Sequence, residues 1–418
     1  MKERTNSFRG ENELELTGNL DGGQRRVNRL ALAITASLVV VSCVYLALLV
    51  SNRQSALFGI GVLIGITLYH GSFSFPSAWR QFIVERRGSD IRAHALMLAV
   101  GAGLFLPVLA AGTLFGTKVS AAAAPVSVSV FCGAFISGIG MQLSSRCACG
   151  TLYSANGGGI SMIVTLFAFI AGSVLGTAHM VYWSVLPSLG SLTFGDTFGA
   201  VPALALSWIV LGGISILTVV VERRRHGTGA PPPISVSSQH SLVHGPWPLA
   251  AAALLLAVLN FATLAVSGQA WRVTSAFALW GAKAVSATGI KVARWPYWAS
   301  YDNAVALAAP LSHDVPTVMN VGIMLGAMMA AALAGRYAPV WRVPLRPLLA
   351  AAFGGLMLGY GARLAYGSNV GAYFSGIVSA SAHGWLWLLA AFAGSAVGIR
   401  LRPRLGLPIE SGVPASDR

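Results

Sequence analysis

Residues 143–153 include the side chains best suited to chemistry. This segment contains one arginine, two serines and two cysteines one residue apart, and a run of glycines follows it. Because such residues do not suit a lipid-facing helix, they predict a broken helix, which membranes tolerate only where it is buried in protein or lines a water-filled cavity. Cys147 and Cys149 offer weak S–H donors and soft sulfur acceptors. We therefore predict that Arg146, both thiols and Gly150 line an anion pathway, which amides at the start of the following half-helix would also favour.

The composition indicates that membrane helices position this segment. Of the 418 residues, 55% are hydrophobic and only 10% are charged, whereas soluble proteins carry roughly 25% charged residues. Runs without charge, interrupted in places by glycine, serine or proline, predict an all-α polytopic membrane protein of about ten hydrophobic passes, some formed by broken or re-entrant helices. The ten runs are residues 30–50, 54–79, 93–116, 119–145, 160–178, 198–221, 248–270, 315–335, 347–362 and 384–399.

The distribution of basic residues predicts the topology. The strongest clusters are in residues 2–29, 80–92, 223–225, 336–346 and 400–404. Placing all five in the cytosol follows the positive-inside tendency, puts both termini in the cytoplasm of a bacterium with the passes in its inner membrane, and leaves residues 180–197 outside. The net charge of +15 is then a consequence of topology and does not indicate a nucleic-acid partner.

The same pattern divides the chain into five parts. We expect a disordered cytosolic tail (1–29), a first transmembrane half (30–221), a cytosolic linker (222–246), a second transmembrane half (247–407) and a short cytosolic tail (408–418). The linker is rich in arginine, proline and serine, which is typical of a connection between folded units.

Three pairs of similar segments recur in the same order on either side of the linker. They are residues 73–79 with 271–277, residues 138–150 with 359–371, and residues 171–173 with 393–395. The predicted topology runs the two copies in opposite directions. An inverted repeat of this kind is a common transporter plan, with the substrate site near the midplane between the halves.

Matched positions in the repeat extend the predicted pathway to both halves. Ser77 and Ser275 are equivalent, and Ser368 with Asn369 follows the second copy of the segment that ends in the cysteines. Arg363 is an ionisable residue inside or near a predicted broken segment, which makes it a functional candidate; the alternative is that it extends to the membrane interface. Aromatic residues around Trp298 and Trp387 are interpreted as a belt at that interface.

Residues 138–159 and 359–407, above all Gly-Tyr-Gly-Ala-Arg-Leu-Ala-Tyr-Gly-Ser-Asn-Val-Gly at 359–371, resemble the YeeE/YedE sulfur-transport family in its long form. The resemblance implies an inner-membrane protein that takes up thiosulfate and passes it along central cysteines through weak S–H···S contacts; some relatives are expected to handle selenium compounds. Cys147 matches the family cysteine. Cys149 replaces a small residue, and Ser368 replaces the cysteine of the second repeat.

These observations favour a permease or channel-like transporter for thiosulfate or a related sulfur-containing anion. None of the 13 acidic residues falls within a hydrophobic run, which favours an anionic cargo and passive or gated permeation. Two alternatives are a membrane thiol protein that transfers sulfur through persulfide chemistry and a transporter of a selenium compound. A small cytosolic sulfur carrier protein is a possible partner besides the lipid bilayer. No cofactor or metal is expected, because the histidines and cysteines lack a metal-ligand spacing.

Overall fold

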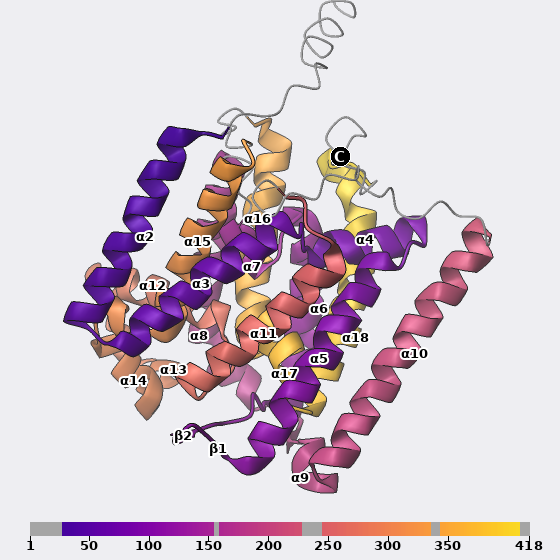
Figure 1. Ribbon diagram of the computed structural model, residues 1–418, viewed down its shortest axis with the longest axis horizontal. Coiled ribbons are helices and arrows are strands. Elements are labelled where there is room, and N and C mark those ends of the chain that lie inside the picture. Colours follow the sequence, from indigo (N-terminus) through magenta and orange to yellow (C-terminus); the bar gives the residue numbers. More distant parts are fainter. Residues whose placement is uncertain (1–26, 154–158, 228–244, 336–342, 410–418) are drawn as a thin grey trace, which may run out of the picture.

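The computed structural model describes residues 27–153, 159–227, 245–335 and 343–409 (Figure 1). Within these ranges, ten helices or joined helical segments are long and apolar enough to cross a membrane, which confirms the predicted all-α polytopic class. Their bounds are α2 (Arg29–Leu49), α3 (Asn52–His70) with α4 (Phe75–Glu85), α5 (Ser89–Ala111), α6 (Val128–Ser144) with α7 (Ala148–Tyr153), α8 (Ile160–Ser184), α10 (Ala200–His226), α11 (Leu249–Ser267), α15 (Val315–Leu333), α16 (Leu345–Leu364) with the π-helix η3 (Asn369–Phe374) and α17 (Ser375–Val378), and α18 (Ala382–Leu401) with η4 (Arg402–Leu405).

Shorter elements connect these spans. They are the strands β1 (Thr113–Leu114), β2 (Thr117–Lys118), β3 (Pro125–Ser127) and β4 (Ser188–Ser191), the helices α9 (Phe194–Phe198), α12 (Val273–Ala287), α13 (Pro296–Ala299) and α14 (Tyr301–Ala308), and the 3-10 turns η1 (Val292–Arg294) and η2 (Leu311–His313). Strand β1 pairs with β2, and β3 pairs with β4, both antiparallel.

Two predicted boundaries differ from the structure. The run 119–145 is not helical from its start, because α6 begins only at Val128; Ser127 caps it by accepting a hydrogen bond from the amide of Val130 (3.3 Å). The linker predicted over residues 222–246 begins inside helix α10, which continues through His226 and ends before Gly227, a glycine with φ of 72°. Residues 228–244 of that linker, most of the first tail and residues 410–418 of the second lie outside the described residues.

Helix packing reveals a repeat of five spans. Helices α2, α3, α5, α6 and α8 of the first half correspond to α10, α11, α15, α16 and α18 of the second. Helix α16 packs along α8 as α18 packs along α6, α15 packs along α3 as α5 packs along α11, and α2 lies on α15 as α10 lies on α5. In Figure 1, α2 descends from the end of the molecule at which the chain enters, whereas α10 rises toward that end. The two copies therefore run in opposite directions.

Glycines at equivalent positions hold the two halves together. A Cβ added to Gly138 would overlap the carbonyl of Ala391, and one added to Gly359 would overlap that of Phe169. The same register gives two matched hydrogen bonds, from Ser395 Oγ to the Gly138 carbonyl (3.2 Å) and from Ser173 Oγ to the Gly359 carbonyl (3.4 Å). Close backbone approach through small residues is the usual way in which helices associate in membranes, where the hydrophobic effect does not drive them together.

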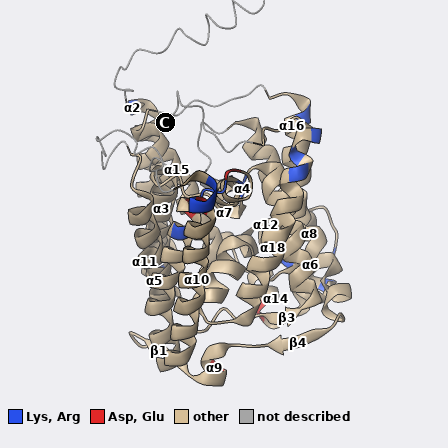
Figure 2. Ribbon diagram, turned by 90° about the vertical axis from the view of Figure 1, so that its right-hand side faces the viewer, with Lys and Arg blue, Asp and Glu red and all other residues tan. Residues whose placement is uncertain are grey.

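Basic residues gather at one end of the molecule. Figure 2 shows lysines and arginines concentrated toward the end at which α10 finishes and α16 begins. The described chain also starts and ends there (Figure 1). We call this end the terminal face and the other end, which carries the strands, the opposite face.

Two aromatic residues correct the predicted interfacial belt. Trp298 and Trp387 are 2% and 0% exposed. The indole of Trp298 donates a hydrogen bond to Thr177 Oγ1 (3.3 Å), and that of Trp387 stacks on Tyr373 with ring centroids 5.8 Å apart. Both residues therefore pack between helices of the protein and do not lie at the lipid interface.

Candidate functional site

The cysteines lie at a break in the first copy of the repeat. Helix α6 ends at Ser144, and Ser145 adopts a left-handed conformation with φ of 58° before α7 resumes. Cys147 and Cys149 are 1% and 2% exposed, and their thiols interact with each other. The amide of Gly150 donates a hydrogen bond to Cys147 Sγ (3.2 Å). The predicted broken helix is confirmed, and it presents two adjacent buried thiols.

The second copy breaks at the equivalent place. Helix α16 ends at Leu364, Tyr366 is left-handed with φ of 57°, and the chain resumes as a π-helix at Asn369. Ser368 and Asn369 are both 1% exposed. Ser368 Oγ and both side-chain polar atoms of Asn369 have no hydrogen-bond partner among the described residues. Buried polar atoms nearly always have partners, so these three are available to a ligand.

A small apolar cavity lies against the cysteines. Its volume is about 20 Å³, room for about one water molecule, so a tetrahedral oxyanion enters only if side chains move. Both repeats contribute to it: Phe73 and Trp271 are equivalent positions, as are Cys149 and Val370. The lining residues are Leu68, Phe73, Phe75, Met97, Cys147, Cys149, Leu256, Asn260, Trp271, Val370 and Phe374.

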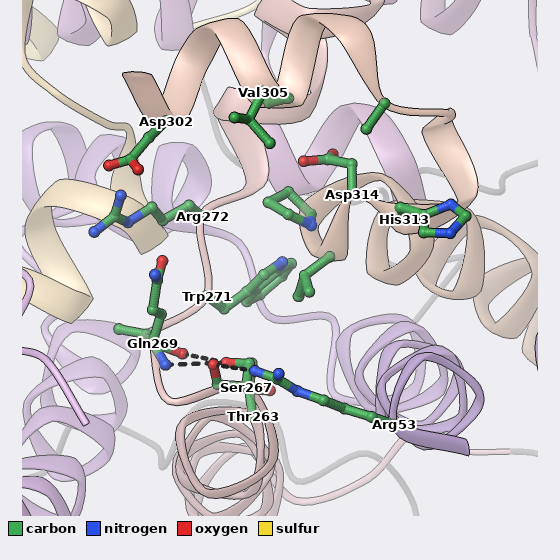
Figure 3. Close-up of a pocket in the computed structure, with 15 residues that line it drawn as sticks. Arg53, Thr263, Ser267, Gln269, Trp271, Arg272, Asp302, Val305, His313 and Asp314 are labelled. Carbon is green, nitrogen blue, oxygen red and sulfur yellow. Dashed lines mark hydrogen bonds between the residues drawn. The ribbon is translucent and has the colours of Figure 1, made fainter. Parts of the chain in front are cut away.

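A much larger vestibule, of about 500 Å³, lies toward the opposite face. Its residues come from the start of α3, the end of α11 and the segment from α14 to α15 (Figure 3). Arg53 donates hydrogen bonds to the carbonyls of Val266 (2.9 Å) and Ser267 (2.6 Å). Arg272 faces the vestibule and extends in Figure 3 toward Asp302, with which it forms no ion pair within the described residues.

The carboxylate of Asp314 in the vestibule already accepts hydrogen bonds from the protein. Its Oδ2 accepts hydrogen bonds from the amide (2.9 Å) and hydroxyl (2.5 Å) of Thr317 at the start of α15. Burial raises the pKa of this carboxyl above its ordinary value, although the bonds from Thr317 oppose that shift. Arg272 is therefore the group in the vestibule that is best placed to attract an anion.

Trp271 separates the vestibule from the cysteine cavity. It lines both spaces, is 3% exposed, and its Nε1 has no hydrogen-bond partner among the described residues. Ser375 Oγ, in the second broken helix, donates to its carbonyl (3.4 Å). Trp271 therefore forms part of the wall between the two spaces.

The remaining predicted residues lie outside the two cavities. Ser77 and Ser275 each donate a hydrogen bond to the carbonyl three residues earlier, Ser74 (3.1 Å) and Arg272 (2.7 Å). Their matched geometry follows the repeat, and it places both hydroxyls on their own helices. Arg146 is half-buried in the turn between α6 and α7.

Arg363 is buried within the protein. Its side chain is 7% exposed, its Nη1 donates to the Tyr297 hydroxyl (2.8 Å), and its guanidinium lies 5.2 Å from the centre of that ring. A cation–π contact in a desolvated setting is worth about 2 kcal/mol.

The sequence did not predict two residues that line the cavities, Trp271 and Asn260. The one available signal was the match of Trp271 to Phe73 in the repeat.

The fold and the site define a class of protein. Inverted copies with helices broken between them, and a charged vestibule that leads toward buried polar groups, are the plan of a multi-pass membrane transport protein. The comparison with protein families agrees: the family model described as "Sulphur transport" matches residues 70–397. The chain belongs to this family.

Three curated relatives share parts of the sequence. Over 168 residues the chain is 32% identical to "Probable transporter YedE" of Salmonella typhimurium and 30% identical to the protein of the same name in Escherichia coli. Each match covers 39% of this chain and 40% of the relative, so the chain spans less than half the length of these relatives. A longer match, 25% identical over 342 residues, covers 78% of this chain and 92% of "Thiosulfate transporter TsuA" from Spirochaeta thermophila.

Proposed function

We propose that this protein is a permease for the uptake of thiosulfate or a closely related sulfur-containing anion. The observation that carries the proposal is the pair of adjacent buried thiols at the break between α6 and α7, against a cavity that both repeats line. The family membership and the name of the Spirochaeta thermophila relative support the same cargo.

The two ends of thiosulfate match the side chains of the two broken helices. Its terminal sulfur is soft and polarizable and suits the weak S–H donors of Cys147 and Cys149. Its oxygens are hard acceptors and suit the hydroxyl of Ser368 and the amide of Asn369, which have no protein partner among the described residues. Recognition by both kinds of group distinguishes thiosulfate from sulfate, which has oxygens at every corner.

Passage then proceeds in three stages. Arg272 attracts the anion into the vestibule, since a cation there raises the local anion concentration. Trp271 swings aside, and the anion reaches the thiols, where its sulfur accepts S–H hydrogen bonds. It then leaves past α7 toward the terminal face. No covalent bond forms or breaks, and the transport is a gated permeation down the gradient of the anion.

The orientation belongs to the same proposal. The arginine-rich terminal face lies in the cytoplasm under the positive-inside tendency, in the inner membrane of a bacterium, and the vestibule opens outward. Anions therefore enter from the vestibule side. A small cytosolic sulfur carrier protein would accept the product at the terminal face.

Growth provides the first test. Bacterial cells unable to import sulfate, with thiosulfate as the sole sulfur source, should grow when they express the protein and fail to grow with Cys147→Ala. Cys132→Ala is the matched control, because Cys132 lies on α6 half-buried and outside the cavity. Normal growth of the Cys147→Ala strain, or no growth with well-folded wild-type protein, would contradict the proposal.

Sulfur transfer is the competing chemistry at the same thiols. A cysteine thiolate would attack the outer sulfur of thiosulfate, and the S–S bond of thiosulfate would break. The outer sulfur would remain on the cysteine as a persulfide, and sulfite would be released. This step needs a thiolate and therefore a base, and none of the described residues that line the cysteine cavity is His, Asp, Glu or Lys. Release of sulfite in step with thiosulfate consumption would favour transfer over permeation.

A further inference from the structure

We propose that Arg80 and Arg402 form a second anion site, between the cysteine segment and the terminal face, that accepts a divalent tetrahedral oxyanion. The site rests on the proposed transport function for its role in the pathway, but its binding of an oxyanion does not depend on that function. It lies on the far side of the cysteines from the vestibule.

A single glutamine joins the two guanidinium groups. Gln142, near the end of α6, is fully buried. Arg80 Nη1 donates a hydrogen bond to its side-chain oxygen (3.4 Å), and Arg402 Nη1 donates to its backbone carbonyl. The side chain of Gln142 is fixed in turn by donating to the Pro76 carbonyl (3.0 Å). Two segments far apart in the sequence, α4 and η4, thus bring two cations to one residue.

The two guanidinium groups are buried, and the only opposite charge acting on Arg80 among the described residues is the carboxylate of Glu85 on the same helix. The side chains of Arg80 and Arg402 are 8% and 2% exposed, and neither forms an ion pair with a carboxylate in the part of the chain that the structure describes. The two charges repel each other. Arg80 Nε is buried without a hydrogen-bond partner among the described residues. Burying an unpaired charge is costly, and a bound anion removes that cost.

Packing accounts for only one of the two arginines. Arg402 also donates to Ser145 Oγ (2.9 Å) and to the Pro408 carbonyl (2.7 Å), so it holds the end of α6 and suits the negative end of that helix. Among the described residues, Arg80 makes one long hydrogen bond, and its Nε has no partner. A helix-stabilising role explains Arg402 and leaves Arg80 unexplained, whereas an anion between them satisfies both.

The position fits an exit step. Ser145, which Arg402 contacts, is two residues from Cys147, so an anion that leaves the thiols toward the terminal face meets this pair next. The vestibule side has a counterpart, because Arg272 and Arg363 also lie close enough for their charges to repel. Positive charge therefore lies on each side of the cysteines, with Arg272 facing the vestibule and Arg80 and Arg402 on the side of the terminal face.

Binding is tested on purified full-length protein in detergent. Sulfate is titrated at constant ionic strength with gluconate as the other anion, in an Arg53→Gln, Arg272→Gln background that removes both arginines of the vestibule. Sulfate should raise Tm in this background, since a ligand that binds the folded state stabilises it. Arg80→Gln should weaken the apparent affinity by about ten- to a hundredfold, whereas Arg86→Gln, at an exposed arginine on the same segment, should leave it unchanged.

The sulfate-free protein provides the second readout. Arg80→Gln should fold with Tm equal to or above that of its parent, because it removes a buried charge that forms no ion pair among the described residues. A purely structural arginine would instead lower Tm with and without sulfate. An unchanged sulfate response in Arg80→Gln, or a loss of Tm in the absence of sulfate, would overturn the site.

Flux separates this inference from the transport proposal. In oriented proteoliposomes, Arg80→Gln should raise the half-saturating thiosulfate concentration on the terminal face by about tenfold or more and leave that on the opposite face unchanged. If wild-type protein moves no thiosulfate while the Arg80-dependent sulfate response persists, the transport proposal fails and the anion site stands. If Arg80→Gln raised the half-saturating thiosulfate concentration equally on both faces, the proposed exit site would be wrong.

Discussion

At the scale of single residues, the two broken helices differ in the chemistry that they present. Equivalent positions carry Cys147 in one copy and Ser368 in the other, with similar backbone conformations before each, since Ser145 and Tyr366 are both left-handed. The two breaks are therefore symmetric in their backbone and asymmetric in their side chains. A soft site and a hard site in series can orient an anion that has one end of each kind.

The first prediction concerns the soft site. Cys147→Ser keeps a hydroxyl donor of similar size but replaces the polarizable sulfur, so thiosulfate flux should fall about tenfold, or about 1.4 kcal/mol. Flux of ³⁵S-labelled thiosulfate into proteoliposomes measures the change. Cys132→Ser, outside the cavity, serves as the control. Equal flux in both variants would show that the Cys147 thiol does not contact the cargo.

The second prediction concerns Trp271. Trp271→Ala removes the side chain between the vestibule and the cysteine cavity, so the two spaces should join, sulfate flux should rise and the preference for thiosulfate should fall. Competition between labelled thiosulfate and unlabelled sulfate provides the measurement. Trp208→Ala, at a half-exposed tryptophan on α10 whose Nε1 bonds the Ala99 carbonyl, is the control. A preference that survives Trp271→Ala would place the selective barrier elsewhere.

Sequence patterns could predict some of these residues and not others. Cys147 and Cys149 could be predicted because two thiols beside an arginine are costly in a lipid-facing helix. Trp271 follows a hydrophobic run, where a tryptophan usually marks the interface. Arg80 and Arg402 each belong to a basic cluster that topology alone explains. Their shared contact with Gln142 depends on packing between segments more than 60 residues apart, which no local pattern encodes.

At the scale of elements, glycines decide how closely the helices of the two repeats approach. The hydrophobic runs could predict the spans, because 20 or so apolar residues are what a bilayer requires. They could not predict where α6 begins: residues 119–127 are apolar enough for a helix, but residues 125–127 pair with β4 as a strand and α6 starts only after them. The hydropathy pattern therefore predicts the membrane segments, whereas local hydrogen bonding determines the residues at which the helices begin and end.

The third prediction tests the matched glycines. Gly138→Val and Gly359→Val should each lower the free energy of unfolding by about 1–3 kcal/mol, because the added atoms overlap backbone carbonyls that cannot move freely. Gly212→Val on α10, where an added Cβ has no neighbour within 4 Å, is the control. Thermal unfolding in one detergent compares all three. A destabilisation at Gly138 without one at Gly359 would contradict the equivalence of the two interfaces.

At the scale of the whole molecule, the inverted repeat places different surfaces at the two faces. The terminal face carries most of the basic residues, and the opposite face carries the strands and the vestibule (Figures 1 and 2). The repeat could be predicted from three matched segments and the charge pattern together. The vestibule could not, because residues of α3, α11 and the segment before α15 meet there only in the folded chain.

The fourth prediction tests the orientation. In a variant without native cysteines, Arg224→Cys at the end of α10 should react with a membrane-impermeant maleimide only after cells are opened. Phe115→Cys, at the fully exposed turn between β1 and β2, should react in intact cells. The reverse labelling pattern would show that the protein has the opposite orientation, with the vestibule facing the cytoplasm.

Flux of thiosulfate into proteoliposomes is the most direct test of the proposed function, with sulfate, sulfite and selenite measured beside it on wild-type and Cys147→Ala protein of equal Tm. We predict that the wild type moves thiosulfate fastest, releases no sulfite, and loses about nine-tenths of that flux in Cys147→Ala, a tenfold effect. Thiosulfate flux no faster than in protein-free vesicles, or flux that Cys147→Ala leaves intact, would contradict transport through the paired thiols.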